Sequence, residues 1–203
     1  MKEELKHLRD AAVKWSDAVR INKIQASEAW YCLNATIMKT IEYPLVATTF
    51  TAKQLHSVMK PILKVALNKC GVQKRLPRKL VYGTLRSRGL GLKDPFLVQL
   101  IQHLLVILRH SHRDTPTHDL LDENMELVQF HVGSAATFWD LPFAQYGCLA
   151  PDGWIKHLWQ CLDDTPLSLK GPCLAAKPQR DNDVFLMDAF VDRGYEGGLV
   201  HSQ

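Results

Sequence analysis

The side chains best suited to chemistry in this sequence are lysines and arginines gathered between residues 69 and 93. The stretch KCGVQKRLPRKLVYGTLRSRGLGLK holds eight basic residues and no acidic one, whereas the whole chain has 25 Lys and Arg against 21 Asp and Glu. Its charge therefore exceeds the net charge of +4, and the rest of the chain is slightly acidic. A concentrated positive field suits the binding of phosphate groups. A basic loop that is solvated and binds nothing is the alternative that this pattern leaves open.

Three histidines could in principle hold a metal. His110, His112 and His118 lie close together in the sequence, and Cys148 or Cys161 could join them around zinc. Neither a CxxC nor an HxxxH spacing occurs, however, and structural zinc sites depend on such spacings. Surface histidines near a helix end are the favoured interpretation, and we predict no metal site.

Catalytic arrangements are equally sparse. The carboxylate pairs Asp163-Asp164 and Asp181/Asp183 fall in or beside expected loops, where helix capping is favoured over metal-dependent phosphoryl transfer. The run GTLRSRGLG lacks the lysine-serine ending of a P-loop, and no nucleophile-elbow sequence orders a Ser, His and Asp. We predict no catalytic residue. A small metal-dependent hydrolase would require the histidines and carboxylates to converge in space.

Apolar residues at spacings of three and four predict seven helical segments. These segments cover residues 3–19, 27–42, 51–70, 95–110, 116–132, 151–162 and 183–192. Strand signal is almost absent, apart from a short candidate at 167–169. The expected fold class is all-α: an irregular bundle of about seven helices with a basic loop that contains Gly and Pro, and little or no strand. Two parts are expected, a helical domain over 1–133 that includes loop 69–93, and a smaller helical and coil extension over 134–203 packed on it.

Particular residues predict where these helices begin, where one of them kinks, and which of them is buried. Thr51 begins a capping box, and Pro61 inside the same helix should kink or split it. Asp94-Pro95 is a strong helix start, and the helix that follows is apolar on most sides, so we expect it at the centre of the fold.

The composition indicates an intracellular protein of the cytoplasm or nucleus that is not bound to a membrane. No apolar run approaches the roughly 20 residues that span a bilayer. The polar start MKEELKHLRD lacks the apolar core of a signal peptide. Five scattered cysteines are odd in number, which favours free thiols in a reducing compartment.

Several longer stretches occur in an order and spacing that point to a family. They are EAWYCLNATIMKTIEYPLVATTFT, KPILKVALNKCG, LPRKLVYGTLRSRGLGLKDPF, GSAATFWDLPFAQYGCLAPDGWIKHLWQCL and DVFLMDAFVDRGYEGG. The first three resemble the region that follows the catalytic palm in reverse transcriptases of non-LTR-type retroelements, and the last two resemble the continuation of the same polyproteins. The resemblance runs from about Leu8 to Gly198.

This resemblance implies a thumb-like helical region that grips the template–primer duplex of an RNA-directed DNA polymerase. The parent polymerase would use magnesium, held by a Tyr/Phe-x-Asp-Asp motif that does not occur in this sequence. The chain is therefore expected to be a fragment of a retrotransposon polymerase, inactive by itself, without a cofactor of its own and without the palm and fingers that would be its partners.

The resemblance also assigns a role to the basic loop. The residues implied to contact phosphates of an RNA–DNA hybrid or another nucleic acid are Lys74, Arg75, Arg78, Lys79, Arg86 and Arg88. Gly89 and Gly91 would allow a close approach of the backbone to nucleic acid or to the core helix. Plain turn geometry before Asp94-Pro95 explains the two glycines equally well.

A different class of function is open beside this one. The chain could be a stand-alone helical protein-interaction domain, which would dock an acidic partner through the same basic loop.

Overall fold

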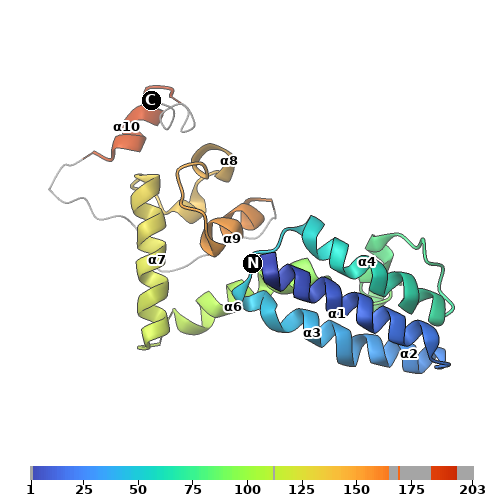
Figure 1. Cartoon of the computed structure of the whole chain (residues 1–203). Coiled ribbons are helices and arrows are strands. Elements are labelled where there is room, and N and C mark those ends of the chain that lie inside the picture. Colours follow the sequence, from blue (N-terminus) through green and yellow to red (C-terminus); the bar gives the residue numbers. More distant parts are fainter. Residues whose placement is uncertain (1, 112, 165–168, 170–183, 196–203) are drawn as a thin grey trace. The chain divides into compact units, whose positions relative to one another are not determined.

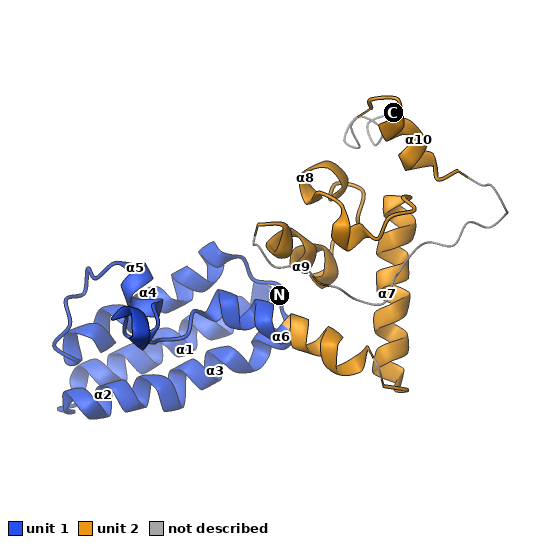
Figure 2. Ribbon diagram, turned by 180° about the vertical axis from the view of Figure 1, so that it is seen from behind, with its two compact units in different colours: residues 1–102 blue, residues 103–203 orange. Residues whose placement is uncertain are grey.

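The computed structural model describes residues 2–111, 113–164, 169 and 184–195. Within these residues every regular element is a helix, which confirms the all-α fold class (Figure 1). The chain divides into two compact units, residues 1–102 and residues 103–203, which we call unit 1 and unit 2 (Figure 2). None of the helices in the described part is long and apolar enough to cross a membrane.

Unit 1 is built on the long helices α1 (Lys2–Ile21) and α4 (Ala52–Lys69), which pack side by side (Figure 1). The apolar stripe predicted for the first helix is confirmed, because Leu5, Leu8, Ala12 and Val19 are all buried. Trp15 from the same stripe is partly buried, and its indole Nε1 donates to Thr36 Oγ1 over 2.9 Å.

The second predicted helix is a chain of short helical pieces rather than one regular helix. It consists of α2 (Ala26–Cys32), a π-helical turn η1 (Leu33–Ile37), α3 (Met38–Glu42) and a 3₁₀ turn η2 (Tyr43–Ala47). The predicted N-cap, Ser27, lies inside the helix, and the helix begins two residues earlier, because Gln25 is the N-cap and forms a capping box with Glu28. The helical path continues beyond residue 42, the predicted end before Tyr43-Pro44, since proline is tolerated in the first turn of η2.

Helix α4 supplies more buried residues to the core of unit 1 than any other helix. Its capping box at Thr51 is confirmed, because Thr51 Oγ1 accepts from Gln54 N and Gln54 Oε1 accepts from Thr51 N. Pro61 does not split it, and the helix is continuous from Ala52 to Lys69. The largest fully buried side chains of this core are Leu8, Leu33, Ile41, Leu45, Phe50, Leu55, Met59, Ile62, Leu63 and Leu67.

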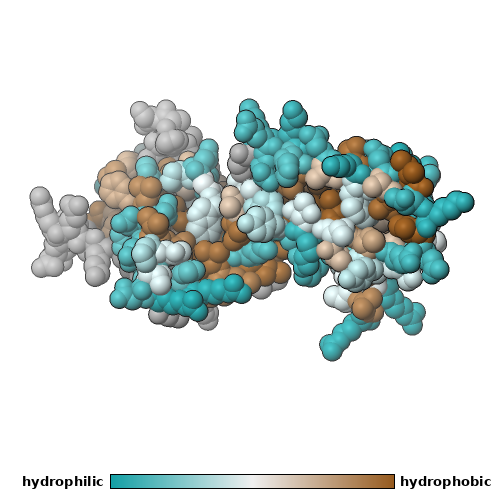
Figure 3. Space-filling model, turned by 60° about the horizontal axis from the view of Figure 1, so that its bottom comes forward, coloured by the Kyte–Doolittle hydropathy of each residue, from teal (hydrophilic) through white to brown (hydrophobic). Residues whose placement is uncertain are grey.

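Helix α6 (Pro95–His110) starts as predicted but is not the central, fully buried helix that its composition suggests. Asp94 Oδ1 accepts from Phe96 N over 3.0 Å at its start. Its exposed apolar residues are Leu97, Ile101, Leu105 and Leu108, each at least 37% exposed. Two polar residues, Gln99 and His103, are buried instead, at 1% exposure each. On the face of the molecule drawn in Figure 3, hydrophobic atoms lie exposed among hydrophilic ones.

Unit 2 gathers around a second core. Its elements are α7 (Pro116–Val132), η4 (Phe138–Asp140), α8 (Phe143–Tyr146), α9 (Trp154–Asp163) and α10 (Leu186–Asp192). Thr115 caps α7, and Gly133 ends it in the left-handed conformation at φ 65°. The core of unit 2 includes Leu121, Met125, Val128, Phe138 and Trp159.

The boundary between the units differs from the predicted division after residue 133. Helix α7 packs on α9 and η4, so its buried face belongs to the core of unit 2. Two short helices that the sequence did not predict, η4 and α8, lie between the predicted helical segments 116–132 and 151–162. The strand candidate at 167–169 lies outside the described residues except for Leu169, and most of the C-terminal tail is outside them as well.

Candidate nucleic-acid interface

The basic loop contains more structure than turns alone. Within it lie the short helix α5 (Arg78–Tyr82), which follows Pro77, and the 3₁₀ turn η3 (Leu85–Ser87). Thr84 Oγ1 accepts from Ser87 N over 3.3 Å and caps η3. The predicted basic loop thus contains two short helical elements, which begin after Pro77 and Thr84.

Backbone hydrogen bonds tie the outgoing and returning arms of the loop together. Leu90 N donates to Leu80 O over 2.8 Å, and Leu92 N donates to Val81 O over 3.2 Å. Val81 and Leu92 are at most 1% exposed and belong to the core of unit 1, together with residues of α4. The loop is therefore anchored in the core by its own backbone and by two buried side chains.

The loop glycines have an internal reason for being glycine. Gly89 is buried against Gly83, and a Cβ at Gly89 would collide with the backbone of Gly83. Gly91 has φ +69°, a conformation that L side chains rarely adopt. Gly89 thus approaches Gly83 closely, and the positive φ of Gly91 favours glycine there, whereas a close approach of either glycine to nucleic acid stays a prediction.

The six basic residues proposed for phosphate contact are all exposed: Lys74, Arg75, Arg78, Lys79, Arg86 and Arg88. None of them lies within ion-pair distance of a carboxylate in the described part of the chain. The two basic residues at the ends of the loop have structural contacts instead. Lys69 Nζ donates to Asn22 O over 2.9 Å, and Lys93 Nζ lies 3.6 Å from Glu42 Oε1. The end residues thus fix the loop, whereas the six between them have no counterion within the part of the chain that the structure describes.

The positive charge extends well beyond the loop. Between Glu42 and Asp94 the chain holds eleven Lys and Arg and no acidic residue. Unit 1 as a whole has 18 Lys and Arg against 7 Asp and Glu, a net charge of +11, and unit 2 has 7 against 14, a net charge of −7. The net charge of the whole chain, +4, does not reveal that the two units have opposite charges. Counting charged residues over 43–93 would have revealed the excess of positive charge from the sequence alone.

Tyr82 lies at the end of α5 in this positive region. Burial, helped by the carboxylate of Asp94 and opposed by the Arg78 guanidinium, raises the pKa of its hydroxyl to about 12. Within the described residues the buried hydroxyl has no hydrogen-bond partner. Tyr82 therefore stays protonated at neutral pH and does not offset the charge of the loop.

The residues considered for metal binding do not come together in the described part of the chain, where no three His, Cys, Asp or Glu side chains could hold a metal ion. His118 Nε2 instead lies 3.3 Å from Asp122 Oδ2, one turn further along α7. Asp164 follows the last residue of α9 as its C-cap. His112, Asp181 and Asp183 are outside the described residues.

The cysteines considered as possible zinc ligands are free thiols. Cys148 is exposed and Cys161 is buried, and burial raises the pKa of the Cys161 thiol. Cys161 Sγ lies 3.9 Å from His157 Nδ1, and burial lowers the pKa of that histidine. A protonated thiol beside a neutral imidazole is a poor nucleophile, so this pair offers no catalytic site.

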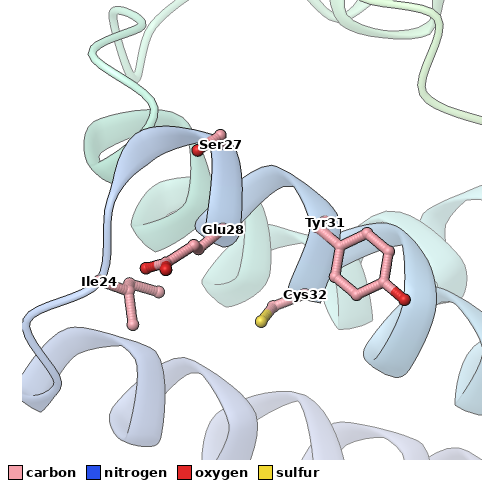
Figure 4. Close-up of a pocket in the computed structure, with 5 residues that line it drawn as sticks. All are labelled: Ile24, Ser27, Glu28, Tyr31 and Cys32. Carbon is pink, nitrogen blue, oxygen red and sulfur yellow. The ribbon is translucent and has the colours of Figure 1, made fainter.

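An open depression beside α2 is the other surface feature of unit 1 (Figure 4). It is lined by Ile24, Ser27, Glu28, Tyr31 and Cys32. Glu28 Oε2 is already used, because it accepts from Gln25 N over 2.9 Å in the capping box of α2. With one carboxylate and no cation in its lining, this depression does not suit a phosphate.

Comparison of the chain with protein-family models, with curated proteins and with solved structures gave no match.

Proposed function

We propose that unit 1 is a nucleic-acid-binding module whose basic loop contacts the phosphate backbone of an RNA–DNA hybrid. The observation that carries this proposal is a set of six exposed cations, held on an anchored loop in a unit of net charge +11, that have no carboxylate partner among the described residues. The resemblance in sequence to the region after the palm of non-LTR-type reverse transcriptases supports the choice of a hybrid duplex. In that role the chain grips the template–primer duplex, and the palm of the parent polymerase performs DNA synthesis.

The chemistry of the loop suits phosphates rather than bases. Four of the six residues are arginines, whose planar guanidinium can donate two parallel hydrogen bonds to phosphate oxygens. Contacts of this kind fix the position of a duplex and carry no sequence information. The module should therefore bind duplexes of different sequence with similar affinity.

The anchoring of the loop favours binding as well. Because Val81 and Leu92 hold the loop in the core, the cations need little further ordering of the backbone when a ligand binds. Binding then costs less conformational entropy than it would for a free, basic tail.

A charge-reversal experiment tests the proposal. The variant K74E/R75E/R78E/K79E is compared with the wild-type chain by fluorescence anisotropy on a 20-bp RNA–DNA hybrid. We expect affinity to fall by at least about 100-fold and the log–log salt slope to fall in magnitude by about 3 to 4, because each phosphate contact contributes about 0.9. Circular dichroism confirms that the variant is folded.

The control has the same change in net charge at exposed positions outside the loop sequence, K6E/K14E/K23E/R113E. A similar loss of affinity in both variants would overturn the assignment of the site. If the wild type binds an acidic polypeptide such as polyglutamate through the loop, and does not bind the hybrid, the docking of an acidic protein partner replaces the proposed function.

A further inference from the structure

Helix α4 carries a row of cations outside the basic loop. Lys53, Lys60 and Lys64 are exposed and are separated by seven and four residues. At 3.6 residues per turn, these spacings place the three side chains on one stripe of the helix. The helix contains no Asp or Glu. Lys69 is on a different side, where its ammonium group donates to Asn22 O.

Helix α1 adds an arginine to this row. The Arg9 guanidinium donates from Nε and Nη2 to Ser57 Oγ, over 3.2 and 3.0 Å. Ser57 lies on the same stripe of α4, four residues after Lys53 and three before Lys60. The contact therefore holds a fourth positive charge beside the lysines.

The row has no internal counterion. Neither Arg9 nor any of the three lysines lies within ion-pair distance of a carboxylate among residues 2–111, 113–164, 169 and 184–195. Like charges one turn apart, such as Lys60 and Lys64, destabilise a helix slightly. An anionic ligand would remove that repulsion.

The backbone beneath the row is fixed. The opposite side of α4 is buried in the core through Leu55, Val58, Met59, Ile62 and Leu63. At a rise of 1.5 Å per residue, Lys53 and Lys64 are roughly 16 Å apart along the helix axis. Nucleic-acid phosphates repeat about every 3.4 Å per strand along a duplex, so the row spans about five base pairs. A row of this length on an anchored helix matches a phosphate backbone better than a single small anion.

We propose that Arg9, Lys53, Lys60 and Lys64 form a second phosphate-binding row, which contacts the backbone of the same nucleic acid that the basic loop binds. This inference rests on the proposed function of unit 1. It adds up to four phosphate contacts to the six of the loop.

The test compares two double variants of the full chain on the 20-bp hybrid. K60Q/K64Q removes two charges from the row, and K14Q/K23Q removes two exposed charges of unit 1 from outside it. Glutamine and lysine have similar helix propensity, so both variants should fold. We expect the salt slope of K60Q/K64Q to fall in magnitude by about 2, and that of K14Q/K23Q to stay close to wild type.

The possible failures can be told apart. If K60Q/K64Q changes the slope no more than K14Q/K23Q, while K74E/R75E/R78E/K79E still loses affinity, the row on α4 is wrong and the function of the loop stands. If the wild-type chain does not bind the hybrid, the proposed function fails and the second row fails with it.

Discussion

The side-chain amide of Gln99 holds both backbone groups of Phe50. Gln99 Nε2 donates to Phe50 O over 3.0 Å, and Gln99 Oε1 accepts from Phe50 N over 3.1 Å. Both residues are 1% exposed. The amide thus satisfies two buried backbone groups in the segment between η2 and α4, where no helical hydrogen bond is available to them.

Unit 2 contains a similar arrangement. Gln129 Oε1 accepts from Phe138 N over 2.8 Å, and its Nε2 donates to Ser134 O and Ala136 O over 2.7 and 2.8 Å. In each unit, a buried glutamine on a helix therefore fixes an irregular segment that ends in a fully buried phenylalanine.

Replacing Gln99 by alanine should destabilise unit 1. The substitution leaves the N–H and C=O of Phe50 buried without partners, which costs about 2–4 kcal/mol in free energy of unfolding. Urea unfolding of the full chain, with hydrogen exchange of the α4 amides as the probe of unit 1, measures the loss of stability. The Phe50 amide hydrogen should also exchange much faster in the variant than in wild type. Gln102→Ala is the control, because Gln102 Oε1 has no hydrogen-bond partner within the described residues. Equal losses in the two variants would show that the pairing of Gln99 with Phe50 contributes nothing.

The pairing also explains why the sequence predicted α6 only in part. Asp94-Pro95 fixes where this helix begins, because the cap is a local interaction between neighbouring residues. The buried face could not be predicted, because it depends on the backbone of Phe50, a contact 49 residues away. Periodicity alone favours burying Ile101, which is 54% exposed in the structure.

Gly89 should tolerate no side chain. Gly89→Ala would push a methyl group into the backbone of Gly83, and overpacking of this kind costs about 1–3 kcal/mol. The arms of the loop should separate, so the amides of Leu90 and Leu92 should lose protection from hydrogen exchange. Gly153→Ser is the control, because nothing lies within 4 Å of a Cβ at that N-cap position, where serine is favoured. Unchanged protection of Leu90 and Leu92 in Gly89→Ala would contradict the close approach of Gly83 and Gly89.

Tyr82 should make the stability of unit 1 fall at high pH. Burial raises the pKa of its hydroxyl from 10.0 to about 12, so the unfolded chain releases this proton at lower pH than the folded chain. The resulting stabilisation is complete below pH 10 and is lost as the pH rises from 10 to 12, with a total on the order of 2 kcal/mol.

The variant Tyr82→Phe isolates this effect from the titration of lysines. Its stability between pH 10 and 12 should fall less steeply than that of wild type, as measured by unfolding in urea at several pH values. At pH 7 the variant should be at least as stable, because the lost hydroxyl has no hydrogen-bond partner among the described residues. Parallel pH profiles for the two proteins would exclude a buried Tyr82 hydroxyl.

Thr51 gives a simpler prediction. Thr51→Ala removes the cap of α4 and should cost about 1 kcal/mol in free energy of unfolding, whereas Thr51→Ser keeps the hydroxyl and should cost much less. Thermal unfolding of both variants checks this. A serine variant as unstable as the alanine variant would mean that the hydroxyl is not the cap.

The sequence predicted which charged residues make up the candidate interface, but it did not predict the conformation of the loop that carries them. The six basic residues of the loop could be chosen because no acidic residue interrupts them. Their anchoring could not, because it depends on Val81 and Leu92 reaching a core built mainly by α1 and α4. The sequence analysis did not single out the lysine row on α4, because its lysines are interspersed with core residues. They form a row only when the sequence is placed on a helix.

The most direct measurement for the central claim is the affinity of the full chain for a 20-bp RNA–DNA hybrid as a function of salt between about 50 and 300 mM. The account predicts a straight log–log plot with a slope of roughly −5 if the six loop residues alone are engaged, and a steeper slope if the row on α4 also binds. A flat plot, or no binding at the lowest salt, would contradict phosphate recognition by unit 1.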